Sequence, residues 1–228
     1  MLQKPMEELE NRIGYQFRNR DLLRQALTHS SFLNEQKIHK TQDYERVEFL
    51  GDAILEMVSS EFLYHRYPEM PEGELSKLRA SMVCEKALAF CARDLELGQY
   101  LILGKGEDAT GGRERESIIA DVMESITGAI FLDSGLEEAK RFIFEFILND
   151  LENKQLFVDS KSKLQELVQG KYHCEVHYEL IGESGPDHDK TFHVNVRMGD
   201  RLLGTGSGRN KKLAEQQAAY QALLALKE

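Results

Sequence analysis

Carboxylates that share one face of a predicted helix are the first residues of this sequence that could do chemistry. Within the apolar stretch 45–55, Glu45, Glu48 and Asp52 stand three and four residues apart. At about 3.6 residues per turn, these spacings place all three side chains on one helix face. Like charges at such spacings weaken a helix by roughly 0.2–0.5 kcal/mol per pair unless a cation lies between them. The stretch alone leaves two interpretations open, a solvated acidic face and one wall of a cation site.

A second acidic pair favours the cation site. Asp121 and Glu124 are three residues apart in the stretch 117–126, again on one face of an apolar helix. Two such faces that pack together would gather carboxylate oxygens without any His or Cys. Hard oxygen ligands suit Mg²⁺ or Mn²⁺ and not zinc. Two divalent ions roughly 3.5–4 Å apart can activate water and stabilise the leaving alkoxide of a phosphodiester.

The pattern is that of a known family. The sequence Glu-Arg-Val-Glu-Phe-Leu-Gly-Asp-Ala-Ile-Leu at 45–55 resembles the signature of bacterial ribonuclease III, and 119–133 is similar to that family's second acidic helix. Residues 26–31 and a downstream double-stranded-RNA-binding domain extend the resemblance over nearly the whole chain. It implies a homodimeric, Mg²⁺-dependent endoribonuclease that cuts double-stranded RNA, with Mn²⁺ as a substitute. Its products would carry 5′-phosphate and 3′-hydroxyl ends with short 3′ overhangs, and its role would be to process ribosomal or messenger RNA precursors.

The resemblance also implies a role for each acid. Four residues match the family's metal ligands: Glu48, Asp52, Asp121 and Glu124. Asp52 and Glu124 are those that catalysis should tolerate losing least. Glu45 and Glu72 match outer acids that help to position metal, water or substrate, and we count them with the catalytic residues.

An all-α domain over 1–150 is predicted to position the acids. Val47, Leu50, Ile54 and Val58 form the apolar stripe opposite the first acidic face. We expect one helix over 75–97 and a last helix over 136–149. The Gly-rich segment 104–116 is expected to be an exposed, solvated loop, although Arg113 and Arg115 could contact phosphate. His29 is expected to pack or form hydrogen bonds rather than bind a metal.

A small α+β domain follows over 159–228, after a linker at 151–158. Alternating apolar residues at 176–180 and 192–198 predict strands, and helical patterns flank them in an α-β-β-β-α order. Domains of this kind read A-form shape across about 16 base pairs with little sequence preference. By resemblance, five residues would contact RNA: Gln165 and Glu166 in the first helix, His188 in the loop between the first two strands, and Lys211 and Lys212 at the start of the last helix.

Charge and composition limit the alternatives. The net charge of −10 argues against a nucleic-acid binder, but 18 of the 29 basic and 28 of the 39 acidic residues lie in 1–150. Residues 151–228 are therefore neutral, and the acidity belongs to the predicted metal-binding domain. No run of eighteen apolar residues exists, which excludes a membrane span. The N-terminal residues do not resemble a signal peptide, and three cysteines without zinc-type spacing predict a reduced, cytoplasmic protein.

Two rival functions remain. A non-catalytic double-stranded-RNA-binding protein could keep the same fold, although the presence of all six acids argues against it. An acidic helical scaffold with an appended RNA module would show no effect of divalent ions on its first domain.

Overall fold

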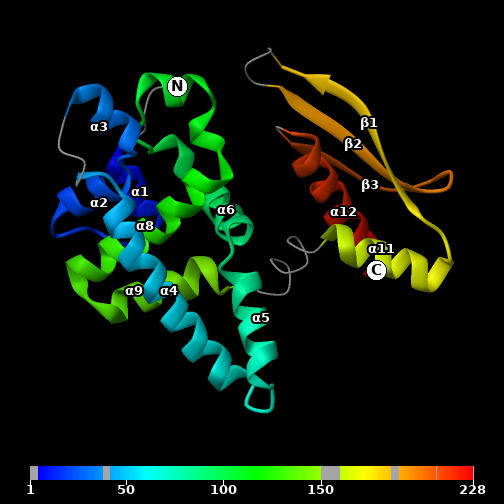
Figure 1. Ribbon diagram of the computed structural model, residues 1–228, viewed down its shortest axis with the longest axis horizontal. Coiled ribbons are helices and arrows are strands. Elements are labelled where there is room, and N and C mark those ends of the chain that lie inside the picture. Colours follow the sequence, from blue (N-terminus) through cyan, green and yellow to red (C-terminus); the bar gives the residue numbers. More distant parts are fainter. Residues whose placement is uncertain (1–4, 38–41, 150–159, 186–189, 209, 228) are drawn as a thin grey trace. The chain divides into compact units, whose positions relative to one another are not determined.

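The chain forms two compact units, residues 1–149 and 150–228 (Figure 1). The computed structural model describes residues 5–37, 42–149, 160–185, 190–208 and 210–227. The first unit is helical and the second combines a three-stranded sheet with two helices, so the predicted fold class is confirmed. The predicted linker at 151–158 lies outside the described residues, and the domain boundaries at 150 and 159 stay a prediction.

Helices of very different length build the first unit. In chain order they are α1 (Met6–Arg12), α2 (Arg20–Ala26), α3 (Ser30–Gln36), α4 (Glu45–Arg66), α5 (Glu72–Met82), α6 (Glu85–Asp94), the 3₁₀ turn η2 (Leu97–Gln99), α7 (Lys105–Ala109), the 3₁₀ turn η3 (Gly112–Glu114), α8 (Glu116–Ser134), α9 (Leu136–Phe142) and the π-helical turn η4 (Ile143–Ile147). Within the described ranges, none of the helices combines the length and the hydrophobicity that a membrane span requires.

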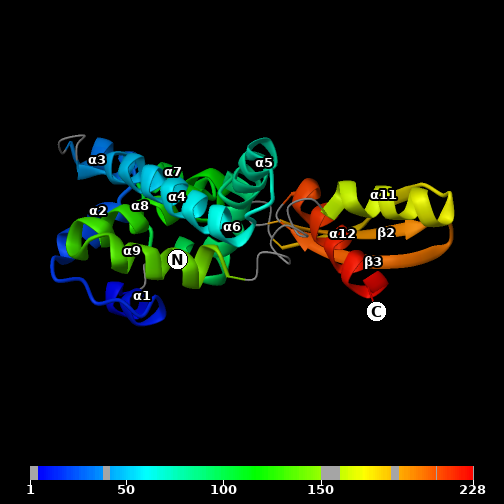
Figure 2. The same cartoon turned by 90° about the horizontal axis from the view of Figure 1, so that it is seen from below.

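The two long helices, α4 and α8, pack against each other and carry the predicted acids. Figure 2 shows α4 running along the unit beside α8. The predicted stripe of α4 is buried at Val47, Ile54 and Val58, whereas Leu50 is only partly buried. Most of α8 is buried, which explains why its sequence is apolar on more than one face. Its few acidic side chains are therefore held in a largely apolar setting.

The single helix predicted over 75–97 is wrong. The chain forms α5 and α6 instead, with a break at Val83 and Cys84. Cys84 has extended backbone angles, φ −70° and ψ 157°, and precedes the first turn of α6. Neither Gly nor Pro marks this break, so the apolar periodicity alone did not predict it. After the break, α6 packs against α8, a contact between distant parts of the sequence.

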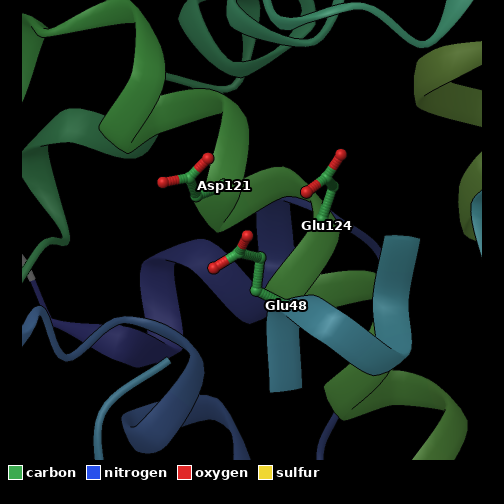
Figure 3. A group of neighbouring side chains, drawn as sticks. All are labelled: Glu48, Asp121 and Glu124. Carbon is green, nitrogen blue, oxygen red and sulfur yellow. The ribbon is translucent and has the colours of Figure 1, made fainter. Parts of the chain in front are cut away.

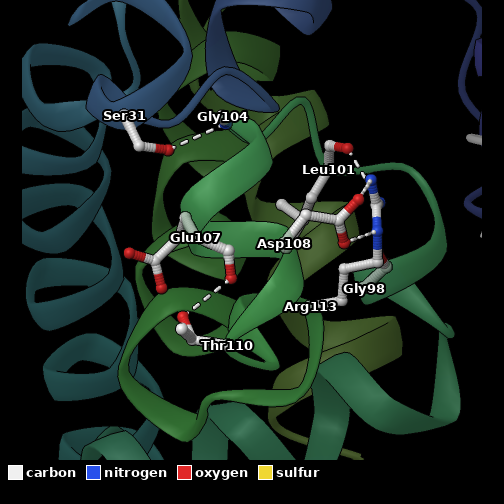
Figure 4. A network of polar contacts seen from close by, with 8 residues as sticks. All are labelled: Ser31, Gly98, Leu101, Gly104, Glu107, Asp108, Thr110 and Arg113. Carbon is white, nitrogen blue, oxygen red and sulfur yellow. Dashed lines mark hydrogen bonds and ion pairs between the residues drawn. The ribbon is translucent and has the colours of Figure 1, made fainter. Parts of the chain in front are cut away.

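The exposed loop predicted over 104–116 is also wrong, because this segment contains α7 and η3. Figure 4 shows the polar contacts that hold it. The Arg113 side chain is only 13% exposed and pairs with Asp108, with Nε 2.7 Å from Oδ1. Its Nη1 donates to the carbonyl oxygens of Gly98 and Leu101 at 3.0 and 2.9 Å. Arg113 is thus a structural residue rather than a phosphate contact.

The second unit has the predicted α-β-β-β-α order. Its elements are α11 (Ser160–Tyr172), β1 (Val176–Ser184), β2 (Thr191–Met198), β3 (Arg201–Gly208) and α12 (Lys211–Lys227). The strands pair antiparallel in the order β1-β2-β3. Both helices pack on one face of the sheet, where Leu164, Val194, Val196 and Ala218 belong to the core. Gly206 permits this packing, because a Cβ atom there would lie 2.2 Å from the backbone nitrogen of Ala218.

Candidate active site

Two glycines bring the acidic faces of α4 and α8 together. A Cβ atom at Gly51 would lie 1.8 Å from the carbonyl oxygen of Glu124, and one at Gly128 would lie 2.3 Å from that of Val47. Real Cβ atoms do not approach other atoms so closely, so the helix backbones touch only because both residues lack a side chain. Each glycine costs its helix about 1 kcal/mol relative to Ala. That cost is offset by a contact that places Glu48 opposite Glu124.

Three of the four predicted metal ligands converge at this contact. Glu48 of α4 and Asp121 and Glu124 of α8 each offer a carboxylate oxygen, and these oxygens lie within 4.8 Å of one another. Figure 3 shows the three carboxylates gathered around one space between the helices. All three residues are partly buried, so each is screened from water yet still accessible.

The electrostatics of this cluster favour a cation. Burial, followed by the negative charge of Asp121, raises the pKa of Glu48 to about 7. Burial, followed by the charges of Asp52 and Glu48, raises the pKa of Glu124 to about 8. Burial also raises the pKa of Asp121. Without a cation the cluster therefore holds protons near neutral pH, and a divalent ion would compete with them for the same oxygens.

Asp52 and Glu45 lie beside the cluster rather than in it. Both side chains are exposed, and neither belongs to the group of oxygens within 4.8 Å. They are nevertheless close enough to act on it electrostatically. After burial, Asp52 is the next cause of the raised pKa of Glu124, and Glu45 contributes to that of Glu48. Asp52 could reach an ion through a bound water or a change of rotamer.

Glu72 lies away from the cluster in its own chain. It begins α5, where its Oε1 accepts a hydrogen bond from Ser76 Oγ at 2.8 Å. It lines a groove of about 380 Å³ with Ser60 and Tyr64 of α4. Those residues are 8 and 12 positions beyond Asp52, or roughly 12–18 Å along the helix. The structure thus does not bring Glu72 together with the other acids.

Tyr44 joins the site, although no spacing or motif in the sequence pointed to it. Its hydroxyl donates to Asp121 Oδ2 at 3.2 Å. Burial and the negative charge of Asp121 raise the pKa of Tyr44, so the hydroxyl stays a donor. His29 lies next to it, with the ring centroids 5.7 Å apart. The Nδ1 atom of His29 also accepts the amide of Ser31 at 3.1 Å, as expected for a hydrogen-bonding rather than a ligating histidine.

Two other features of the first unit were not predicted from the sequence, namely the glycine contact between α4 and α8 and the exposure of Phe49. Gly51 and Gly128 carried a sequence signal, because glycine inside a helical pattern often marks a close packing contact. Phe49 is 79% exposed on α4 despite its size. Helical spacing gave a sign of this exposure, because Phe49 is four residues after Glu45 and three before Asp52 and so shares the acidic face of α4.

The predicted RNA contacts of the second unit are exposed where the structure describes them. Gln165 and Glu166 lie in α11, and Lys211 and Lys212 form the first turn of α12. Asn210 Oδ1 accepts the amide of Leu213 at 2.8 Å, which caps that helix. A lysine pair at a capped helix N-terminus is suited to phosphate. His188 lies outside the described residues.

The cluster is chemically suited to a hard divalent cation. All its donors are carboxylate oxygens, which is the ligand type that Mg²⁺ and Mn²⁺ prefer. Carboxylates of both helices could coordinate a single ion at the same time. Asp52 and Glu45 lie beside the cluster and are exposed to solvent. The arrangement could therefore hold a cation against a phosphate group and a water molecule.

Comparison with protein families accounts for both units. The "Ribonuclease-III-like" family model matches residues 19–151, and that of the "Double-stranded RNA binding motif" matches residues 160–226. The first match contains every acid discussed above, and the second contains the four described RNA-contact candidates.

Relatives and solved structures agree with these matches. The chain is 48% identical over 218 residues to Ribonuclease 3 of Caldanaerobacter subterraneus subsp. tengcongensis, covering 94% of this chain and 95% of that protein. It is 46% identical to Ribonuclease 3 of Shouchella clausii, covering 99% and 87%. The nuclease domain of ribonuclease III from Campylobacter jejuni matches with a TM-score of 0.59 and 43% identity, covering 63% of this chain and 96% of that domain.

Proposed function

Because the chain belongs to the ribonuclease III family, we propose that Glu48, Asp121 and Glu124 hold the divalent ion with which it cuts RNA. The enzyme is an endoribonuclease of double-stranded RNA, and its family is metal-dependent. The observation that carries the proposal is the convergence of these three carboxylates, from two helices, within 4.8 Å. We propose Mg²⁺ as the ion, with Mn²⁺ as a substitute, because the donors are all hard oxygens.

The acidic residues in and beside the cluster have different roles in hydrolysis. A divalent ion held there would supply water activation and charge stabilisation for the leaving alkoxide. Glu48, Asp121 and Glu124 hold it from two helices whose backbones cannot shift without breaking the Gly51 contact. Exposed Asp52 would be a further ligand of that ion, and exposed Glu45 would orient water or RNA beside it. The products carry 5′-phosphate and 3′-hydroxyl ends.

The second unit holds the duplex. Gln165 and Glu166 bind ribose hydroxyls in one minor groove, and His188 binds ribose hydroxyls in the next minor groove. Lys211 and Lys212 bind the phosphates between the two grooves, where the N-terminus of α12 adds its own positive end. The exposure of all four described residues supports these assignments.

A homodimer brings two sites to the two strands. Phe49 supports it, because a phenylalanine 79% exposed on a central helix exposes a large apolar area to water. Ala53 and Met57, one and two turns further along α4, are exposed as well. The description of the Campylobacter jejuni structure names a region involved in dimer formation of its nuclease domain. A two-fold axis near Phe49 would oppose two copies of α4, and each site would cut one strand to leave short 3′ overhangs.

In the cell, such an enzyme would process ribosomal and messenger RNA precursors in the cytoplasm. The match of residues 160–226 to the double-stranded RNA binding motif supports a substrate that contains duplex RNA.

A cleavage assay tests the proposal. A long, perfectly paired RNA is incubated with the protein in Mg²⁺, in EDTA and in Ca²⁺, and the product ends are mapped. We expect cutting in Mg²⁺ only, with 5′-phosphate ends, while single-stranded RNA and duplex DNA stay intact. A retained gel shift without cutting in Mg²⁺ or Mn²⁺ would instead favour the non-catalytic RNA-binding protein.

A further inference from the structure

The side chain of Tyr44 is fixed between the two acidic helices. It is only 4% exposed, and its hydroxyl donates to Asp121 Oδ2 at 3.2 Å. Asp121 is the member of the cluster that receives this bond, so its carboxylate has a defined orientation. A carboxylate that accepts one hydrogen bond retains further lone pairs for a cation.

The backbone of Tyr44 fixes a second member of the cluster. Tyr44 precedes α4, and its carbonyl oxygen accepts the amides of Val47 and Glu48 at 2.9 and 2.8 Å. Its own amide donates to the carbonyl oxygen of Thr28 at 2.9 Å, which anchors the start of α4 to the segment after α2. One residue therefore holds the Glu48 backbone on α4 and the Asp121 carboxylate on α8.

The Tyr44 ring is buried and packs beside the ring of His29. The ring of His29 lies 5.7 Å from that of Tyr44, centroid to centroid, at an angle of 54°. His29 is itself held, because its Nδ1 is 2.8 Å from Ser31 Oγ and accepts the Ser31 amide. The hydrogen bond to Asp121 thus comes from a donor that is already in place before a cation binds.

We infer that Tyr44 is a positioning residue of the metal site, which acts by orienting Asp121 toward Glu48 and Glu124. The inference rests on the proposed function, because it presumes that these carboxylates hold the ion. Partners that orient the ligands of a metal typically change its affinity by about 10–100-fold when they are removed. Tyr44→Phe removes only the hydroxyl and leaves the packed ring and all backbone bonds intact.

Binding of Mn²⁺ to the metal-free full chain, followed by electron paramagnetic resonance, tests this role without any need for cleavage. We expect Tyr44→Phe to raise the dissociation constant about tenfold. Its affinity for duplex RNA in EDTA should be unchanged, since the hydroxyl is buried. Tyr15→Phe is the matched control, because Tyr15 is also buried and donates to a carboxylate of α8, Asp133 Oδ2, at 2.6 Å. That bond is twelve residues, or more than three turns, from Asp121.

The outcomes separate this inference from the proposed function. If Glu124→Gln binds Mn²⁺ as the parent does, the metal site itself is wrongly assigned. If Glu124→Gln loses binding but Tyr44→Phe changes it no more than Tyr15→Phe, the positioning role is overturned. A further loss on adding Tyr44→Phe to Asp121→Ala would also overturn it, because a residue that acts through Asp121 has no effect once that carboxylate is gone.

Discussion

Gly51 of α4 lies against the backbone of Glu124 of α8, so that a Cβ atom on Gly51 would be 1.8 Å from the Glu124 carbonyl oxygen. This contact sets the distance between the two helices that carry Glu48, Asp121 and Glu124. The active site therefore depends on a residue without a side chain as much as on the acids themselves.

Gly51→Ala should separate the helices and damage the metal site. The methyl group must displace backbone, not a flexible side chain, so we expect a loss of stability of about 1–3 kcal/mol and weaker Mn²⁺ binding. Chemical denaturation and Mn²⁺ titration measure the two effects. Gly106→Ala in α7 is the control, since nothing lies within 4 Å of its Cβ position. Equal behaviour of the two variants would contradict the role of the contact.

The metal-free protein should lose stability as the pH rises toward 8. The folded-state pKa of Glu124, about 8, lies above the unfolded value of about 4.3. Protonation of Glu124 thus stabilises the fold fully below pH 4.3, and this stabilisation is lost as the pH rises through 8. Glu124→Gln imitates the protonated acid and does not titrate, so it should lose less stability than the parent between pH 5 and 8 in EDTA.

Thermal melts at both pH values, with and without Mg²⁺, measure this difference. Mg²⁺ should raise the melting temperature of the parent at pH 8 more than at pH 5, because the ion replaces the protons. It should affect Glu124→Gln little. Absence of a Mg²⁺ response in both proteins would favour the acidic helical scaffold, and an equal positive response would show that Glu124 is not a ligand of the ion.

Lys211 and Lys212 should contribute phosphate contacts and not sequence selectivity. Changing both to Ala should weaken duplex RNA binding and reduce the slope of log affinity against log salt by about 2. Filter binding across a salt series gives both values. Lys171→Ala is the control, because Lys171 is an exposed lysine near the C-terminal end of α11. An unchanged slope in the double variant would remove these lysines from the interface.

Phe49 should hold the proposed homodimer together. Phe49→Asp places a charge on this exposed apolar position and should yield a folded monomer in analytical ultracentrifugation. Leu132→Asp is a matched change, because Leu132 is 51% exposed on α8. A parent protein that is already monomeric at micromolar concentration, or a dimeric Phe49→Asp variant, would contradict the proposed interface.

Much of the fold could be predicted because it depends on local patterns. The spacing of Glu45, Glu48 and Asp52 against Val47, Ile54 and Val58 defines α4, and alternation defines β1 and β2. The break at Cys84 and the helical turns over 104–116 could not be predicted, because distant packing decides them. Arg113, for example, bonds to Gly98 and Leu101, which no local pattern relates to it.

The site shows the same division. Spacing placed Glu48, Asp121 and Glu124 on two helix faces. Only the packed helices reveal that the carboxylates of these three residues form a close group to which Asp52 does not belong. The distance of Glu72 from the group and the bond from Tyr44 to Asp121 depend on three-dimensional placement, which residue types and spacing do not contain.

Single-turnover cleavage of duplex RNA in Mg²⁺ by the parent and by Glu124→Gln tests directly whether the cluster holds the catalytic ion. The substitution removes one ligand charge and keeps the shape of the side chain. We expect cleavage to fall by several orders of magnitude while duplex affinity stays within about twofold, and we expect Glu137→Gln on α9 to cut like the parent. Cleavage by Glu124→Gln at close to the parental rate would show that the acids between α4 and α8 do not hold the catalytic ion.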